Sequence, residues 1–161
     1  MKRLLVAVGA GLVVLIGVLI TYHLVRARSV HAQTGCDLTS FSGAYGYNQN
    51  GYVYDSQGNL YFLASTGRIV SDGNGGVTGG DTYSFDGTIA KRTFTGTYSM
   101  NADCTGSATL QITVSNSSGS AHGDLVVVSN GNEINFVQTD PNYILSGIFK
   151  KQQSQQSQQS Q

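Results

Sequence analysis

The chain has 161 residues, and its nine basic residues balance its nine acidic ones. This length suits one domain with a hydrophobic core of its own. Charged residues make up only 11% of the chain, which argues against a nucleic-acid partner, because binding to phosphates needs clustered Lys and Arg.

The N-terminal segment has the pattern of an export signal. The basic start Lys2-Arg3 precedes a long apolar run, Leu4–Ile20, which predicts a hydrophobic helix. Small residues at Val30-His31-Ala32 suit cleavage before Gln33, but the apolar run is nearly long enough to cross a bilayer. We expect residues 1–32 to be a signal peptide or a retained signal anchor. The rest of the chain is then periplasmic, secreted or held outside the cytoplasm, and meets the membrane only through this segment.

The chain contains two cysteines, Cys36 and Cys104. An exported domain meets an oxidising compartment, where a pair of cysteines is most simply one disulfide. The sequence has no C-x-x-C redox pair and no companion set of His and Cys for zinc. We therefore predict a structural disulfide between Cys36 and Cys104.

From Phe41 onward, apolar and polar residues alternate, which is the period of strands with one buried face. Gly, Asn and Asp gather between these runs, as they do in turns. The first strand begins at Phe41 and ends at one of two turn candidates, Asn50-Gly51 or Asp55–Asn59. Further strands are expected at residues 60–71, 77–85, 92–100, 108–114, 125–128, 133–136 and 143–149.

One turn predicts the register of two strands. Asn130-Gly131 lies between two apolar runs, which is the strongest short-range signal for a hairpin. A two-residue turn there places Val127 opposite Ile134 and Leu125 opposite Phe136. All four of these side chains should face the core.

A second turn raises a conflict. If Asp86-Gly87 were a two-residue hairpin turn, Arg92 would lie on the same face as Phe94, which belongs to the apolar face of its strand. We therefore expect a longer connection or a bulge at Asp86-Gly87.

These elements predict an all-β domain at residues 33–150. About eight consecutive strands, joined by short turns without a crossover helix, can close into an antiparallel up-and-down β-barrel. A two-sheet β-sandwich is the alternative. The Gln/Ser-rich tail, residues 151–161, has nothing to bury and is expected to be disordered.

The polar residues suggest no catalytic or metal site. Asp72–Gly76, with Asp81 further on, offers oxygens for calcium but lacks a closing Glu, so we interpret it as a hairpin turn. Strand alternation places Glu133, His122 and Asp124 on the outer face. No Ser lies in a Gly-x-Ser-x-Gly elbow, and no pair of acids converges on a predicted pocket. We assign no catalytic residue, cofactor or metal ligand.

The tyrosines are more numerous than the filling of a core requires, because a buried hydroxyl needs a partner. Inward tyrosines could frame an apolar pocket with a few polar groups, which is typical of small-ligand sites. A solidly packed barrel is the alternative. The pocket candidates are Tyr45, Tyr47, Tyr83 and Tyr98.

Four segments, Gly43–Tyr47, Asp72–Gly79, Gly96–Gly106 and Phe136–Asp140, resemble a group of uncharacterised exported bacterial proteins. That group is similar to small calycin-type barrels and to the allene oxide cyclase barrel. The resemblance covers most of the chain from Cys36 to Lys150 and implies a barrel, but it implies no activity. The chain has no Trp, so the Gly-x-Trp start of lipocalins is missing, and their ligand binding is not implied.

Three functions remain open at this stage. The first expectation is a non-catalytic structural or interaction protein of the cell envelope, with a filled barrel and a functional outer face. The alternative is a module that binds a small apolar ligand inside the barrel. An enzyme of the cyclase or isomerase kind is less favoured, because it needs an inward-facing acid and the sequence suggests none.

Overall fold

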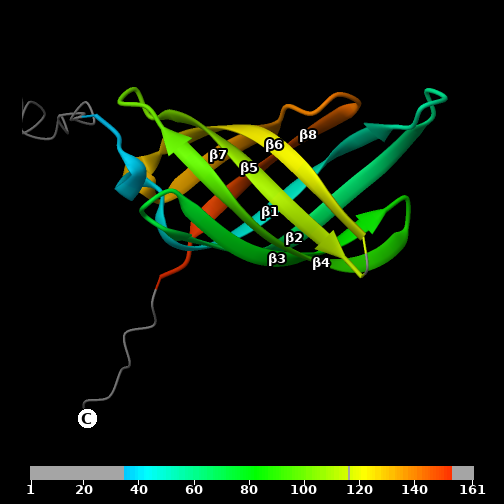
Figure 1. The fold of residues 1–161 in the computed structure, drawn as a ribbon, viewed down its shortest axis with the longest axis horizontal. Coiled ribbons are helices and arrows are strands. Elements are labelled where there is room, and N and C mark those ends of the chain that lie inside the picture. Colours follow the sequence, from blue (N-terminus) through cyan, green and yellow to red (C-terminus); the bar gives the residue numbers. More distant parts are fainter. Residues whose placement is uncertain (1–34, 116, 154–161) are drawn as a thin grey trace, which may run out of the picture. The chain divides into compact units, whose positions relative to one another are not determined.

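The computed structural model describes residues 35–115 and 117–153. Eight antiparallel strands pair in sequence order, and the last pairs with the first to close a barrel (Figure 1). The all-β up-and-down barrel is confirmed, and the two-sheet sandwich is wrong. The expected N-terminal signal or anchor and most of the Gln/Ser tail lie outside the described residues. In the described part of the chain, no helix has the length and hydropathy to span a bilayer.

The strands are long, and within the described residues only two short 3₁₀ turns accompany them. The 3₁₀ turns are η1 (Leu38–Ser40) and η2 (Ser129–Gly131). The strands are β1 (Ser42–Tyr54), β2 (Leu60–Asp72), β3 (Gly76–Phe85), β4 (Thr88–Met100), β5 (Thr105–Val114), β6 (Ser117–Val128), β7 (Glu133–Gln138) and β8 (Tyr143–Lys151).

The predicted register between β6 and β7 is confirmed. Val127 pairs with Ile134, and Leu125 pairs with Phe136. The connection itself is wider than a two-residue turn, because β6 ends at Val128 and β7 begins at Glu133, with η2 between them. The register therefore agrees with the prediction, although the connection is longer than expected.

The expectation of a longer connection or a bulge at Asp86-Gly87 is wrong. Phe85 pairs with Thr88, so the connection is a two-residue turn, and both of its residues have positive φ, 46° and 85°. Asp-Gly favours such a turn because its twist matches that of the strands. Arg92 consequently does face inward beside Phe94, where a buried acid opposite it accommodates the charge.

The first strand does not end at Asn50-Gly51. It continues to Tyr54, and the carboxylate of Asp55 closes the following turn by accepting hydrogen bonds from the backbone N–H groups of Gln57 and Asn59, at 2.9 and 2.8 Å. Position 51 needs Gly because a Cβ there would lie 1.9 Å from the carbonyl oxygen of Ile144 on β8.

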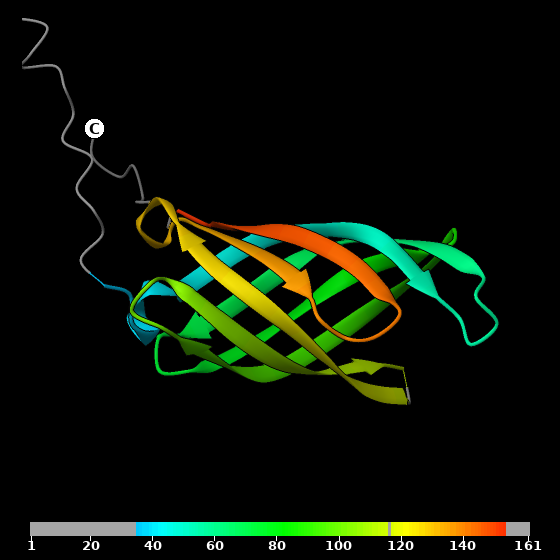
Figure 2. The ribbon, with the colours of Figure 1, turned by 90° about the horizontal axis from the view of Figure 1, so that it is seen from above.

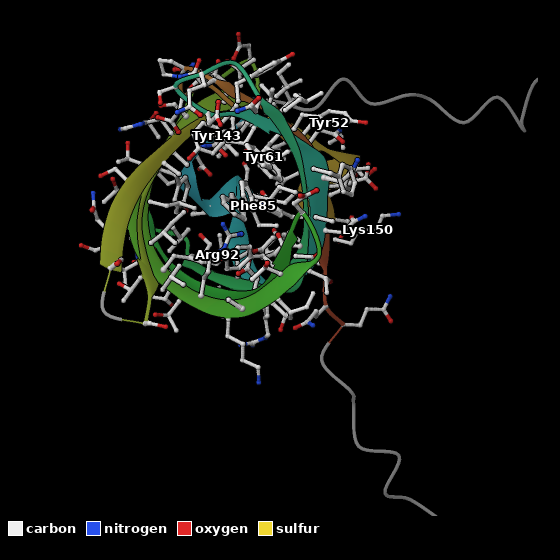
Figure 3. The ribbon with its side chains drawn as sticks, turned by 90° about the vertical axis from the view of Figure 1, so that its right-hand side faces the viewer. Tyr52, Tyr61, Phe85, Arg92, Tyr143 and Lys150 are labelled. Carbon is white, nitrogen blue, oxygen red and sulfur yellow. A yellow bond between two sulfur atoms is a disulfide. The ribbon has the colours of Figure 1, made fainter. Side chains whose placement is uncertain are left out.

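The two ends of the barrel differ, as Figure 2 shows. At one end, which we call the closed end, η1 precedes β1, and Cys36 is bonded to Cys104 in the β4–β5 turn, with sulfurs 1.97 Å apart. Phe41, after η1, is 1% exposed and fills this end. The other end, which we call the mouth, carries the β1–β2, β3–β4, β5–β6 and β7–β8 turns. Figure 3 looks into the mouth, with η1 visible at the far end.

Candidate ligand-binding site

Two connected chambers occupy the interior of the barrel. The outer chamber, at the mouth, has a volume of about 330 Å³, and the inner chamber has a volume of about 80 Å³. Both are lined by Arg92, Ile112, Ala121 and Gln138, so these residues mark the passage between them. A space of this size, open at one end, is typical of a site for a small molecule.

Strand alternation gives both chambers walls that are mainly apolar. Val53, Leu63 and Leu145 are buried together and line the outer chamber, and Phe85 packs against them. The wall formed by β6 carries only small side chains, Ser117–Ala121, and therefore leaves room. Figure 3 shows Phe85 and Arg92 pointing into the barrel, while Tyr52 lies on its outside. The inner chamber continues among aromatic and branched side chains, which include Phe94, Leu110, Leu125, Phe136 and Phe149.

A buried ion pair lies between the chambers. Asp81 on β3 pairs directly with Arg92 on β4, and its carboxylate accepts hydrogen bonds from Nε and Nη2 of Arg92, at 2.9 and 2.5 Å. The hydroxyl of Tyr47 on β1 donates to the same carboxylate at 2.8 Å. The side chain of Asp81 is fully buried, and that of Arg92 is 12% exposed. Such a pair is tolerated inside a barrel because each charge is compensated and hydrogen-bonded.

Electrostatics hold two members of this cluster, Tyr47 and Arg92, in their protonated forms. Burial, and then the negative charge of Asp81, raise the pKa of Tyr47 far above its ordinary value, so its hydroxyl stays protonated and donates. Burial opposes the charge of Arg92, but the hydrogen bonds and charge of Asp81 outweigh it and raise the pKa of the guanidinium. Tyr47 and Arg92 therefore both remain hydrogen-bond donors to the carboxylate of Asp81 near neutral pH.

Arg92 still has one nitrogen free for a ligand. Its guanidinium lies 4.6 Å from the ring centre of Tyr83, and Nη2 also reaches the hydroxyl of Ser65 at 3.4 Å. Its hydrogen bonds to the described residues use Nε and Nη2. Every buried side-chain nitrogen and oxygen in this part of the chain has a partner, so Nη1 is open to the cavity.

The four tyrosines predicted to line a pocket divide into two pairs. Tyr47 lines the inner chamber and Tyr83 the outer one. Tyr45 and Tyr98 also face inward, but they lie near the closed end, where their hydroxyls donate to the carbonyl oxygens of Gly131 and Leu38, each at 2.7 Å. These two residues therefore hold the closed end together and line neither chamber.

The outward acids and His122 form surface contacts. Glu133 lies 3.6 Å from the ammonium group of Lys150, and Nδ1 of His122 lies 2.7 Å from the carboxylate of Asp140. Asp72 accepts hydrogen bonds from the backbone N–H groups of Asn74 and Gly76, as expected for a turn. Within residues 35–115 and 117–153, no group of three or more His, Cys, Asp or Glu is arranged to hold a metal ion.

Sequence reasoning missed Asp81 and the role of Arg92. The signal was present, because alternation from Tyr83 and Phe85 places Asp81 on the same inward face. A two-residue turn at Asp86-Gly87 then puts Asp81 directly opposite Arg92. The pair becomes apparent only when β3 and β4 are aligned, because neither strand alone predicts a partner for its buried charge.

Comparisons with known proteins add no family. No family model, curated protein or solved structure matches the chain.

Proposed function

We propose that this protein binds one small apolar molecule inside its barrel and does not transform it. The observation that carries the proposal is the mainly apolar cavity that opens at the mouth, ends at a plugged closed end and contains one buried ion pair. A closed barrel suits this task because it has no free strand edges and its wall stays rigid while its interior varies. We also propose that the barrel is of the calycin type, which its closed eight-stranded antiparallel architecture supports.

The chemistry of the cavity favours binding over catalysis. Asp81 is the acid that an isomerase-like enzyme would need, but its carboxylate is held by three hydrogen bonds from Tyr47 and Arg92. A general base must be able to accept a proton from its substrate. A carboxylate that is fully buried and paired in this way serves structure and polarity instead.

The proposed site of action is outside the cytoplasm. The bond between Cys36 and Cys104 supports this, because disulfides persist in oxidising compartments. The apolar N-terminal segment predicted from the sequence points the same way.

The experiment is a titration with phenylnaphthylamine, an uncharged dye that fluoresces in apolar surroundings. We expect saturable binding, which Ala121→Phe should abolish because Ala121 lines both chambers. Ala64→Phe is the matched control, because Ala64 lies between the buried residues Leu63 and Ser65 and therefore faces outward. Equal binding by both variants, or no saturable binding to the unmodified protein, would refute the proposal.

An interaction protein remains the second candidate, and one feature of the outer wall favours it. Tyr52, Phe62 and Ile144 are 44%, 45% and 58% exposed and form adjacent pairs on β1, β2 and β8. Their outward neighbours Asn50 and Ser146 are uncharged, so two copies could meet through this face without repulsion. Sedimentation should then show a dimer that Phe62→Ser dissociates, whereas a monomer at all concentrations excludes an interaction between two copies through this face.

A further inference from the structure

We infer that the cavity selects uncharged ligands that carry an oxygen acceptor, such as alcohols, esters or ketones, and rejects carboxylates. This inference rests on the proposed function and names its ligand class. It follows from the state of Arg92 at the passage between the two chambers.

Arg92 supplies the attraction for an oxygen. Nη1 is open to the cavity, while Nε and Nη2 bind Asp81. Because Arg92 lines both chambers, a ligand that spans them passes this nitrogen. Hydrogen bonds from a charged donor are stronger than neutral ones, and more so in surroundings of low polarity.

Asp81 provides the discrimination against acids. Its carboxylate lies 2.5 Å from Nη2 and neutralises the guanidinium. Among the described residues that line the chambers, Arg92 is the only Arg or Lys. A bound carboxylate would therefore lose its hydration without gaining an unpaired cation, and it would share one guanidinium with a second negative charge.

The geometry also determines which polar group fits. The neighbouring walls are mainly apolar, with Ile112 lining both chambers, Phe94 the inner one and Leu145 the outer one. An oxygen on a chain can meet Nη1 while its carbons fill the apolar space on either side. A hydrocarbon without an oxygen fills the same space but leaves Nη1 without a ligand partner.

The test is displacement of phenylnaphthylamine by decanol, decanoate and chlorodecane at neutral pH. Decanol should bind roughly tenfold or more tightly than either of the others. Decanoate that binds as tightly as decanol, or chlorodecane that does so, would overturn the inference, as would failure of all three to displace a bound dye. Absence of dye binding in the first place would instead refute the proposed function, so the two failures are distinguishable.

A variant makes the role of Asp81 measurable. Asp81→Asn keeps an acceptor for Tyr47 and Arg92 but leaves the guanidinium charge uncompensated, so decanoate should gain about tenfold in affinity relative to decanol. Asp124→Asn is the matched control, because Asp124 is exposed on β6, and it should leave the ranking unchanged. An unchanged ranking in a folded Asp81→Asn protein would contradict the inference. If that variant does not fold, the ranking in the unmodified protein still decides.

Discussion

Asp81 and Arg92 face each other across β3 and β4, and two hydrogen bonds of 2.9 and 2.5 Å join their side chains inside the barrel. The two-residue turn at Asp86-Gly87 determines this alignment, since it sets the register of the whole hairpin. The pair places one charged cluster between two chambers whose walls are mainly apolar. It therefore affects both the stability of the barrel and the polarity of its cavity.

Removing one member of this pair should destabilise the protein strongly. Asp81→Leu leaves the guanidinium of Arg92 buried without its counter-charge, and we expect the free energy of unfolding to fall by about 3–5 kcal/mol. Urea unfolding followed by circular dichroism measures the change.

The control for that prediction removes both charges. Asp81→Leu combined with Arg92→Met replaces the pair by apolar side chains, and it should recover most of the lost stability, because a paired buried charge contributes little net stability. A double variant as unstable as Asp81→Leu would show that the loss has another cause.

The sequence predicted more of the fold than of the candidate site. The Asn130-Gly131 turn between two apolar runs predicted the register of β6 and β7. This register keeps Leu125 and Ile134 on the inner face, and a shift by one residue would turn them toward solvent. The inward Arg92 was not expected, because charged residues are rarely buried. Arg92 is an exception because Asp81 lies directly opposite it across the hairpin. This pairing can be predicted only when the length of the turn at Asp86-Gly87 is known.

The sequence also did not predict how deep in the barrel each inward tyrosine lies. Alternation predicts which face a tyrosine occupies, but it does not predict its height along the barrel axis. Tyr45 and Tyr47 share a face, yet Tyr45 binds Gly131 near the closed end while Tyr47 reaches Asp81 and the inner chamber. Height depends on strand tilt and on the closure between β1 and β8, which are properties of the whole sheet.

A single Trp should report on the cavity, because the chain has none of its own. Tyr143 lines the outer chamber and is 40% exposed, so the emission of Tyr143→Trp should shift to shorter wavelength when an apolar ligand enters. Tyr52→Trp is the control on the outer wall, where Tyr52 is 44% exposed, and its emission should not change. Equal shifts in both variants would place the ligand outside the barrel.

The disulfide should contribute substantially to stability. Cys36 and Cys104 are 68 residues apart, and the chain-entropy model assigns a loop of this length about 4 kcal/mol. Reduction should therefore lower the melting temperature clearly. The variant with both cysteines replaced by Ala should melt at the same temperature as the reduced protein, and a reductant should not change its melting temperature. An unchanged melting temperature on reduction would show that the bond does not stabilise the barrel.

Acid should destabilise the barrel through its turns. Hydrogen bonds from the backbone N–H groups of Asn74 and Gly76 hold the pKa of Asp72 below its ordinary value of 3.8. A carboxyl group whose pKa is lowered in the folded state stabilises the fold at pH values above its ordinary pKa. This stabilisation is lost as the pH falls through the pKa of the folded state. The melting temperature should therefore decrease when the pH is lowered below about 4. Asp72→Asn keeps an acceptor but cannot titrate, so its melting temperature should depend less on pH in this range.

The most direct test of a ligand-binding barrel is native mass spectrometry of the protein isolated from the cells that make it. The account predicts an extra mass on the order of a few hundred daltons, which is lost on denaturation, as expected for a molecule that fits the two chambers. The mass should be absent from Ala121→Phe and retained by Ala64→Phe. A bare mass in the unmodified protein, or an adduct that persists in Ala121→Phe, would contradict the account.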